Sequence, residues 1–124
     1  MVYDEKIVAR SENSVVTSGD ITRHAEMKLI SYCSKNINTK IIESSTLYTS
    51  TEPCLMCCGA IVRSGIKRVV YGVAHSRMPR KIDTKNSEIS SKEIFSRMNS
   101  EIKLIGPVME EEGLEIHRTY WPTT

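Results

Sequence analysis

One stretch decides the fold: Thr46-Leu47-Tyr48-Thr49-Ser50-Thr51-Glu52-Pro53-Cys54-Leu55-Met56-Cys57-Cys58-Gly59-Ala60-Ile61. Its first five residues are mostly β-branched or aromatic, which predicts a strand over Thr46–Ser50. Proline suits the start of a helix, so Pro53 predicts a helix from Cys54 to about Ser64. Gly65 then ends that helix. The stretch is therefore a strand followed directly by a helix.

The same alternation of strand and helix continues outward along the chain. The β-branched run Lys67–Gly72 predicts a buried strand, and Ile102–Ile105 predicts another, closed by Gly106-Pro107. The other expected elements are a hairpin around Asp4-Glu5-Lys6, a helix from about His24 to Lys35-Asn36, a helix after Ser90 with capping-box spacing to Glu93, and a last helix over Met109–Tyr120. This order predicts an α/β fold: a three-layer α/β/α sandwich around a mixed, mostly parallel sheet.

Length and composition exclude several classes of protein. The 124 residues suit a single domain over 1–124, with room for one core. The sequence has no apolar run near the ~20 residues of a membrane-spanning helix and no secretory signal, so we expect a cytoplasmic protein with no membrane partner. Seventeen basic and fifteen acidic residues give a net charge of +2, too mild to indicate nucleic-acid binding from charge alone.

The four cysteines are distributed unevenly, because three of them fall within five positions. This clustering favours a metal or redox site over a disulfide framework. Cys33 and Cys58 are expected to be small buried residues of the core, since Cys58 points about 100° around the helix from Cys57.

Two short motifs can form a zinc site. His24 and Glu26 start one predicted helix, and Cys54 and Cys57 start the next, three residues apart on one helical face. Ligation by His24, Cys54 and Cys57 leaves the fourth tetrahedral position of Zn²⁺ open for water, as in catalytic sites. Zinc lowers the pKa of such a water to about 7. Glu26 lies close enough to act as general acid and base without binding the metal.

The combination H-x-E and P-C-x-x-C is the signature of zinc-dependent nucleobase deaminases. The quoted stretch, followed by Arg68-Val69-Val70-Tyr71-Gly72, resembles the cytidine deaminase-like superfamily, on the branch of bacterial guanine deaminases and tRNA adenosine deaminases. The resemblance implies a five-stranded sheet flanked by helices, one zinc per subunit and a homodimer. It also implies that Asn13, Ala25 and Pro53 bind substrate. Relatives usually begin with a helix that this sequence does not show.

The sequence predicts a zinc-dependent hydrolase that cleaves the C–N bond of a cyclic amidine in an amino-substituted nucleobase or nucleoside. Guanine is the leading substrate, and ammonia is the second product. A tRNA-specific adenosine deaminase is an alternative, disfavoured by the mild charge and by the loop His75–Arg80, which lacks the glycine-rich pattern of the tRNA enzymes. A catalytically silent zinc-binding partner subunit is a second alternative, disfavoured because Glu26 is present.

The remaining polar residues carry weaker signals. A basic loop of Arg77, Arg80, Lys81 and Lys85 could contact phosphate or RNA, or could simply be solvated. Tyr120 and Trp121 could close over the pocket or pack against a neighbouring helix or subunit. His75 and His117 receive no role, and the three acids Glu110–Glu112 suit the start of the last helix through its dipole.

Overall fold

The computed structural model describes residues 1–78 and 89–120. Five strands form one mixed sheet in the order β2-β1-β3-β4-β5. The strands are β1 (Val2–Tyr3), β2 (Lys6–Ile7), β3 (Thr46–Thr51), β4 (Arg68–Val73) and β5 (Lys103–Ile105). Strands β3, β4 and β5 run parallel, whereas β1 pairs antiparallel with β2 and β3. The predicted α/β class with a mixed five-stranded sheet is confirmed.

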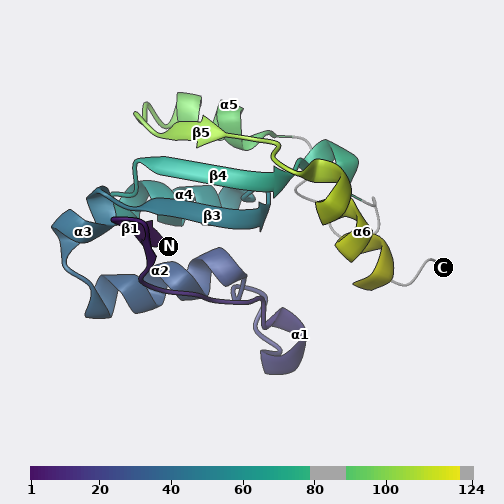
Figure 1. Ribbon diagram of the computed structural model, residues 1–124, viewed down its shortest axis with the longest axis horizontal. Helices are drawn as coiled ribbons and strands as arrows, with labels where there is room; N and C mark the ends of the chain where they lie inside the picture. The colour runs from purple at the N-terminus through teal and green to yellow at the C-terminus, as the bar shows by residue number, and fades with distance from the viewer. Residues whose placement is uncertain (79–88, 121–124) are drawn as a thin grey trace.

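The described residues also form six helices and one 3₁₀ turn, of which α6 follows the last strand (Figure 1). They are α1 (Val15–Ser18), α2 (Ala25–Asn36), α3 (Thr39–Glu43), α4 (Leu55–Ser64), η1 (His75–Arg77), α5 (Ser91–Arg97) and α6 (Glu110–Tyr120). The predicted caps are confirmed. Gly65 ends α4 in the left-handed conformation at φ 87°, and the Ser90 hydroxyl accepts a hydrogen bond from Glu93 N at 3.2 Å.

Three short turns of helix were not predicted from the sequence. No element was expected between the hairpin and His24, where α1 ends at Gly19 with φ 69°. None was expected between Asn36 and Thr46, where Asn38 caps α3 by accepting a hydrogen bond from Lys40 N at 2.9 Å. The predicted loop from His75 onward begins with η1. Segments of three to five residues are too short to show helical periodicity.

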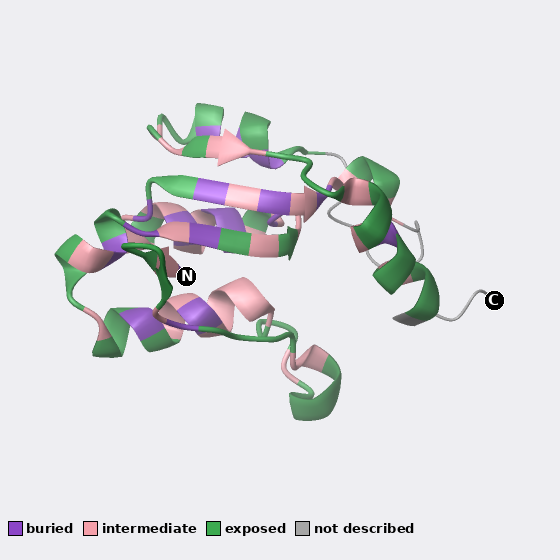
Figure 2. Ribbon diagram, in the orientation of Figure 1, coloured by how far each residue is buried: buried purple, intermediate pink, exposed green. Residues whose placement is uncertain are grey.

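The core lies between the sheet and one layer of helices. Helix α4 packs between α2 and α5, and Figure 1 shows α4 and α5 behind β3, β4 and β5. Leu47 and Val69 face this layer from paired positions of β3 and β4, and both are buried, as are Cys33 and Cys58. Both cysteines are therefore core residues, as predicted. Buried residues alternate with less buried ones along β4 (Figure 2). Tyr48 points to the other face of β3 and is 56% exposed.

Helix α6 lies apart from this layer. It packs against β4 near the carboxyl end of the sheet (Figure 1). The acids Glu110, Glu111 and Glu112 form its first turn, as expected from the helix dipole. Within the described residues, no helix is both long and apolar enough to cross a membrane.

Candidate metal centre and active site

The starts of two neighbouring helices bring the predicted ligands together. His24 is the N-cap of α2 and Cys54 is the N-cap of α4, and both residues have extended backbone conformations. Cys57 lies in the first turn of α4 and is fully buried. Because α2 and α4 pack side by side, His24 meets two cysteines that lie 30 and 33 positions further along the chain.

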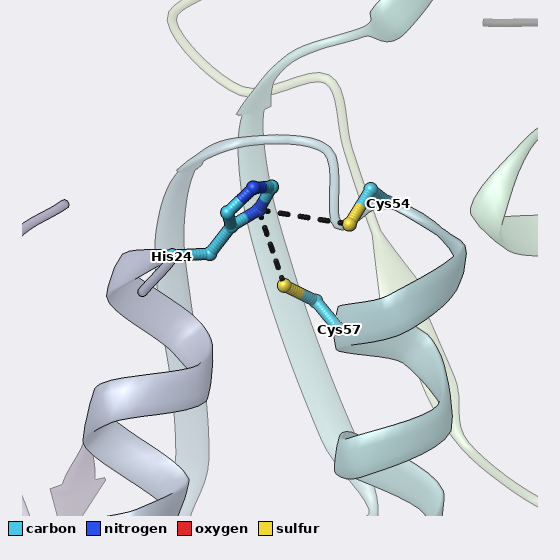
Figure 3. A group of neighbouring side chains, drawn as sticks. All are labelled: His24, Cys54 and Cys57. Carbon is cyan, nitrogen blue, oxygen red and sulfur yellow. Dashed lines mark hydrogen bonds between the residues drawn. The ribbon is translucent and has the colours of Figure 1, made fainter. Parts of the chain in front are cut away.

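The three ligand atoms form a compact triangle. His24 Nδ1 lies 3.6 Å from Cys54 Sγ and 3.6 Å from Cys57 Sγ, and Figure 3 shows both sulfurs pointing toward that nitrogen. All three atoms lie within 4.8 Å of one another. A tetrahedral zinc with ordinary Zn–N and Zn–S bonds holds its nitrogen and sulfur ligands about 3.6 Å apart. The donor set and its spacing therefore fit zinc, the cofactor of this protein.

The two ligand thiols differ in acidity. A hydrogen bond from the Cys57 thiol and the nearby His24 ring lower the pKa of Cys54 to about 4, against the effect of burial. The pKa of Cys57 is raised, because it donates to Cys54, is buried, and faces the Glu26 carboxylate. Zinc binds cysteine as the thiolate, so metal binding releases any proton that the two thiols carry.

Glu26 lies beside the triangle without belonging to it. Its Oε1 accepts a hydrogen bond from Thr49 Oγ1 at 2.7 Å, and its Oε2 is 3.7 Å from Cys57 Sγ. Thr49 comes from β3, so the carboxylate lies between the sheet and α4. Glu26 therefore lies next to the candidate metal site, and its role as a proton carrier stays a prediction.

A cavity of about 530 Å³ adjoins Glu26. Its walls come from the N-terminal residues, from the first turns of α2, and from Leu47–Ser50 of β3. Of the three predicted substrate-binding residues, Ala25 lies in this wall. Asn13 does not; it is exposed, and its Oδ1 accepts a hydrogen bond from Val15 N at 2.9 Å. Pro53 is buried outside the wall. Substrate contact by these three residues stays a prediction.

The loop that carries Cys54 is anchored by a buried carboxylate. Glu52 is 7% exposed, its backbone N donates to Val73 O at 2.8 Å, and its Oε2 lies 3.4 Å from His75 Nδ1. Burial raises the pKa of the neighbouring Cys58 thiol to about 12, and Cys58 donates to Pro53 O at 3.5 Å. Cys58 is thus a structural residue rather than a further ligand.

No side-chain role was predicted for Thr49, Glu52 or His75, although Thr49 contacts Glu26 and the other two lie close to each other next to the loop of Cys54. A signal was available for Thr49. Side chains alternate along a strand, so a buried Leu47 places Thr49 on the same face, toward the helices. No pattern in the sequence pairs Glu52 with His75, because the pair joins the ends of two strands.

Polar contacts fasten α6 near this site. Thr51 Oγ1 lies 3.0 Å from His117 Nε2, and Arg77 forms ion pairs with Glu110 and Glu111 at 3.2 and 2.9 Å. Arg77 is thus engaged within the molecule. The rest of the predicted basic loop, Arg80, Lys81 and Lys85, lies outside the described residues, as do Trp121 and the side chain of Tyr120.

Comparison with known proteins agrees with this geometry. The model of the cytidine and deoxycytidylate deaminase zinc-binding region matches residues 1–73. A probable cytosine deaminase from Schizosaccharomyces pombe is 36% identical over 126 residues, covering 98% of this chain and 76% of that protein. The guanine deaminase of Bacillus subtilis is 41% identical over 76 residues, covering 61% of this chain and 49% of that protein.

A solved structure extends the similarity to the fold. It comes from work on A-to-I editing by tRNA:A34 deaminases at the wobble position of transfer RNA. It has a TM-score of 0.74 and 29% identity, and it covers 93% of this chain and 80% of that one. The zinc-ligand triangle, the adjacent carboxylate and these matches agree. The chain belongs to the cytidine and deoxycytidylate deaminase family and is a zinc-dependent hydrolase of C–N bonds.

Proposed function

We propose that this chain deaminates a free nucleobase or nucleoside, with guanine as the leading substrate. The observation that carries the proposal is the position of Glu26. Its Oε2 lies 3.7 Å from Cys57 Sγ, at the edge of the ligand triangle, while its Oε1 accepts a hydrogen bond from Thr49 in the sheet. A carboxylate so placed can move a proton between water and a substrate that lies against the triangle.

The roles of the residues follow from this placement. His24, Cys54 and Cys57 would hold the zinc, which supplies a water activated for attack at neutral pH. Glu26 accepts the proton of the attacking water at Oε2 and delivers it to a ring nitrogen of the substrate. It then takes the second proton from the hydroxyl now bound to the carbon and passes it to the departing amine. One water is consumed, the C–NH₂ carbon becomes a carbonyl carbon, and ammonia leaves.

Two observations support a small substrate over RNA. The net charge is only +2, whereas RNA binding at a phosphate backbone usually needs a distinct basic surface. The guanine deaminase of Bacillus subtilis also has a higher identity, 41%, although over a shorter alignment. Deamination of tRNA adenosine is the second candidate, supported by the structural similarity to a tRNA:A34 deaminase across 93% of this chain.

The test is ammonia release by the zinc-loaded protein. The panel contains guanine, adenine, cytosine, their nucleosides and a tRNA anticodon stem. We expect turnover of guanine, lost about 10²- to 10⁴-fold in Glu26→Gln with zinc retained. Glu101→Gln, which removes an exposed carboxylate, is the matched control and should keep full activity.

Other outcomes separate the alternatives. Turnover of the anticodon stem alone, with salt-sensitive binding, would replace the guanine proposal with the tRNA proposal. No turnover with one zinc bound per subunit would indicate a silent partner subunit. Loss of zinc in Glu26→Gln would make Glu26 a ligand and contradict its proposed role. The homodimer and the cytoplasmic location stay predictions.

A further inference from the structure

Within the described residues, Thr49 makes the one hydrogen bond that joins Glu26 to the sheet. Its Oγ1 is 2.7 Å from Glu26 Oε1 and 3.2 Å from Thr51 O. A hydroxyl has one hydrogen, and the shorter contact ends on a charged oxygen. Hydrogen bonds to ionised acceptors are shorter and stronger than those to neutral ones, so the hydroxyl hydrogen belongs to the carboxylate.

The contact makes the two oxygens of Glu26 unequal. Oε1 is bound by Thr49, while Oε2 faces Cys57 Sγ at 3.7 Å and so lies on the side of the ligand triangle. The terminal torsion of a glutamate is broad and nearly two-fold, so a carboxylate without a partner samples many orientations. A hydrogen bond to one oxygen removes that freedom and fixes which oxygen faces the metal site.

The donor is also held rigidly. Thr49 lies in β3, which pairs with β4 over its whole length, with Thr49 opposite Tyr71. Its neighbour on the same face, Leu47, is 1% exposed in the core. Threonine is branched at Cβ and has few side-chain rotamers, so the hydroxyl is presented from a fixed point.

We propose that Thr49 is a positioning residue for Glu26. It fixes the carboxylate so that Oε2, and not Oε1, transfers the proton during deamination. Thr49 acts through Glu26 and has no role as a zinc ligand. The kinetic part of this inference rests on the proposed function, whereas the orientation of the carboxylate can be measured without activity.

The first arm of the test is kinetic and uses Thr49→Val and Thr49→Ser. Valine keeps the branched shape and suits a strand, while serine keeps the hydroxyl. In Thr49→Val we expect kcat to fall about 10- to 100-fold, KM to change less than about 2-fold, and zinc to stay at one per subunit. Thr49→Ser should recover most of kcat. Thr46→Val, in the same strand but with no contact to Glu26, is the matched control.

The second arm asks whether the effect passes through Glu26. In the Glu26→Gln background, Thr49→Val should cause no further loss of activity. A loss as large as in the wild-type background would overturn the proposal, because Thr49 would then act independently. Equal falls in kcat/KM and in bound zinc would also overturn it, since they would indicate a structural role in the metal site.

The third arm is a crystal structure of zinc-loaded Thr49→Val. We expect the Glu26 carboxylate to rotate or to occupy more than one orientation. A carboxylate in its original position would overturn the inference. If the wild-type protein deaminates nothing in the panel, the proposed function fails, and this structural arm still decides whether Thr49 orients Glu26.

Discussion

Helices α4 and α6 both lie near β4, but different interactions hold them in place. Helix α4 is held by burial: Cys57, Cys58 and Ile61 are each 0% exposed. Helix α6 buries Leu114, while Ile116, near the middle of the helix, is 65% exposed. Instead, α6 is fastened by side-chain contacts to Arg77 and Thr51.

This difference matters for the candidate zinc site, whose two cysteines lie at the start of only one of the two helices. Burial of apolar surface stabilises by about 25 cal/mol per Å² and, unlike an ion pair, is not screened by dissolved ions. A net hydrogen bond contributes about 1 kcal/mol, and an exposed ion pair often less. The candidate metal ligands Cys54 and Cys57 lie at the start of the helix with the buried face. The helix held by polar contacts supplies none of the zinc ligands.

The largest expected effect comes from truncating a buried side chain of α4. Ile61→Ala should lower the free energy of unfolding by about 2–5 kcal/mol, because it leaves a cavity in a fully packed site. Leu114→Ala removes a similar side chain from α6. It should cost less, because α6 has few other buried contacts and can move to close the gap. Urea denaturation of both variants measures the difference, and equal losses would contradict the comparison.

The same contrast explains what the sequence could predict. The elements around the zinc site, β3, α4 and β4, were predicted to within one or two residues, because the signals were strong and local. They include the β-branched runs, Pro53 before the helix and Gly65 after it. His24, Cys54 and Cys57 were predicted as ligands from their spacing, and the structure places their donor atoms together.

What the sequence could not predict depends on contacts between distant residues. The pairs Thr49 with Glu26 and Thr51 with His117 join residues 23 and 66 positions apart. No periodicity encodes such a pair, since each depends on how the elements pack. The family resemblance implied that Asn13 binds substrate. In the structure its Oδ1 accepts a hydrogen bond from Val15 N within its own loop, and substrate contact stays a prediction.

The next prediction concerns the glycines of the two helices. A Cβ at Gly113 in α6 would lie 2.5 Å from Val73 Cγ2, whereas a Cβ at Gly59 in α4 would meet nothing within 4 Å. Gly59→Ala should therefore stabilise by about 0.5–1 kcal/mol through helix propensity alone. Gly113→Ala gains the same propensity but pushes α6 away from β4, at a cost of about 1–3 kcal/mol.

The net change at Gly113 should be a loss of about 1 kcal/mol. Thermal unfolding of both variants gives the sign directly. Stabilisation by Gly113→Ala would mean that α6 does not pack closely against Val73 in solution. Helix α6 would then be packed even less tightly, relative to α4, than the structure shows.

A smaller effect should follow from pH. Partial burial lowers the pKa of His117 below its ordinary value of about 6.5. Below pH 6.5 the unfolded chain therefore binds a proton that the folded chain does not, so stability falls as the pH drops. His117→Gln should reduce this fall, measured as the difference in Tm between pH 7.5 and 5.5. An unchanged difference would mean that the ring near Thr51 is not buried in solution.

The smallest effect should come from the ion pairs of Arg77. The Arg77 side chain is 46% exposed and its partner Glu111 is 73% exposed, so solvent screens most of their attraction. Glu110 also keeps its bond to Ala74 N at 3.0 Å when Arg77 is removed. Arg77→Ala should therefore lower Tm by about 2 °C at most.

Salt and a matched variant separate this contribution from others. High salt should abolish the difference between Arg77→Ala and the wild-type protein, because exposed charges are screened within about 3 Å at 1 M. Arg97→Ala is the control, because Arg97 pairs with Glu93 inside α5 and joins no second element. Arg77→Ala should lower Tm more than Arg97→Ala, since only Arg77 ties α6 to η1. Equal shifts would mean that α6 is held without Arg77, and therefore mainly through Leu114 and the His117 contact.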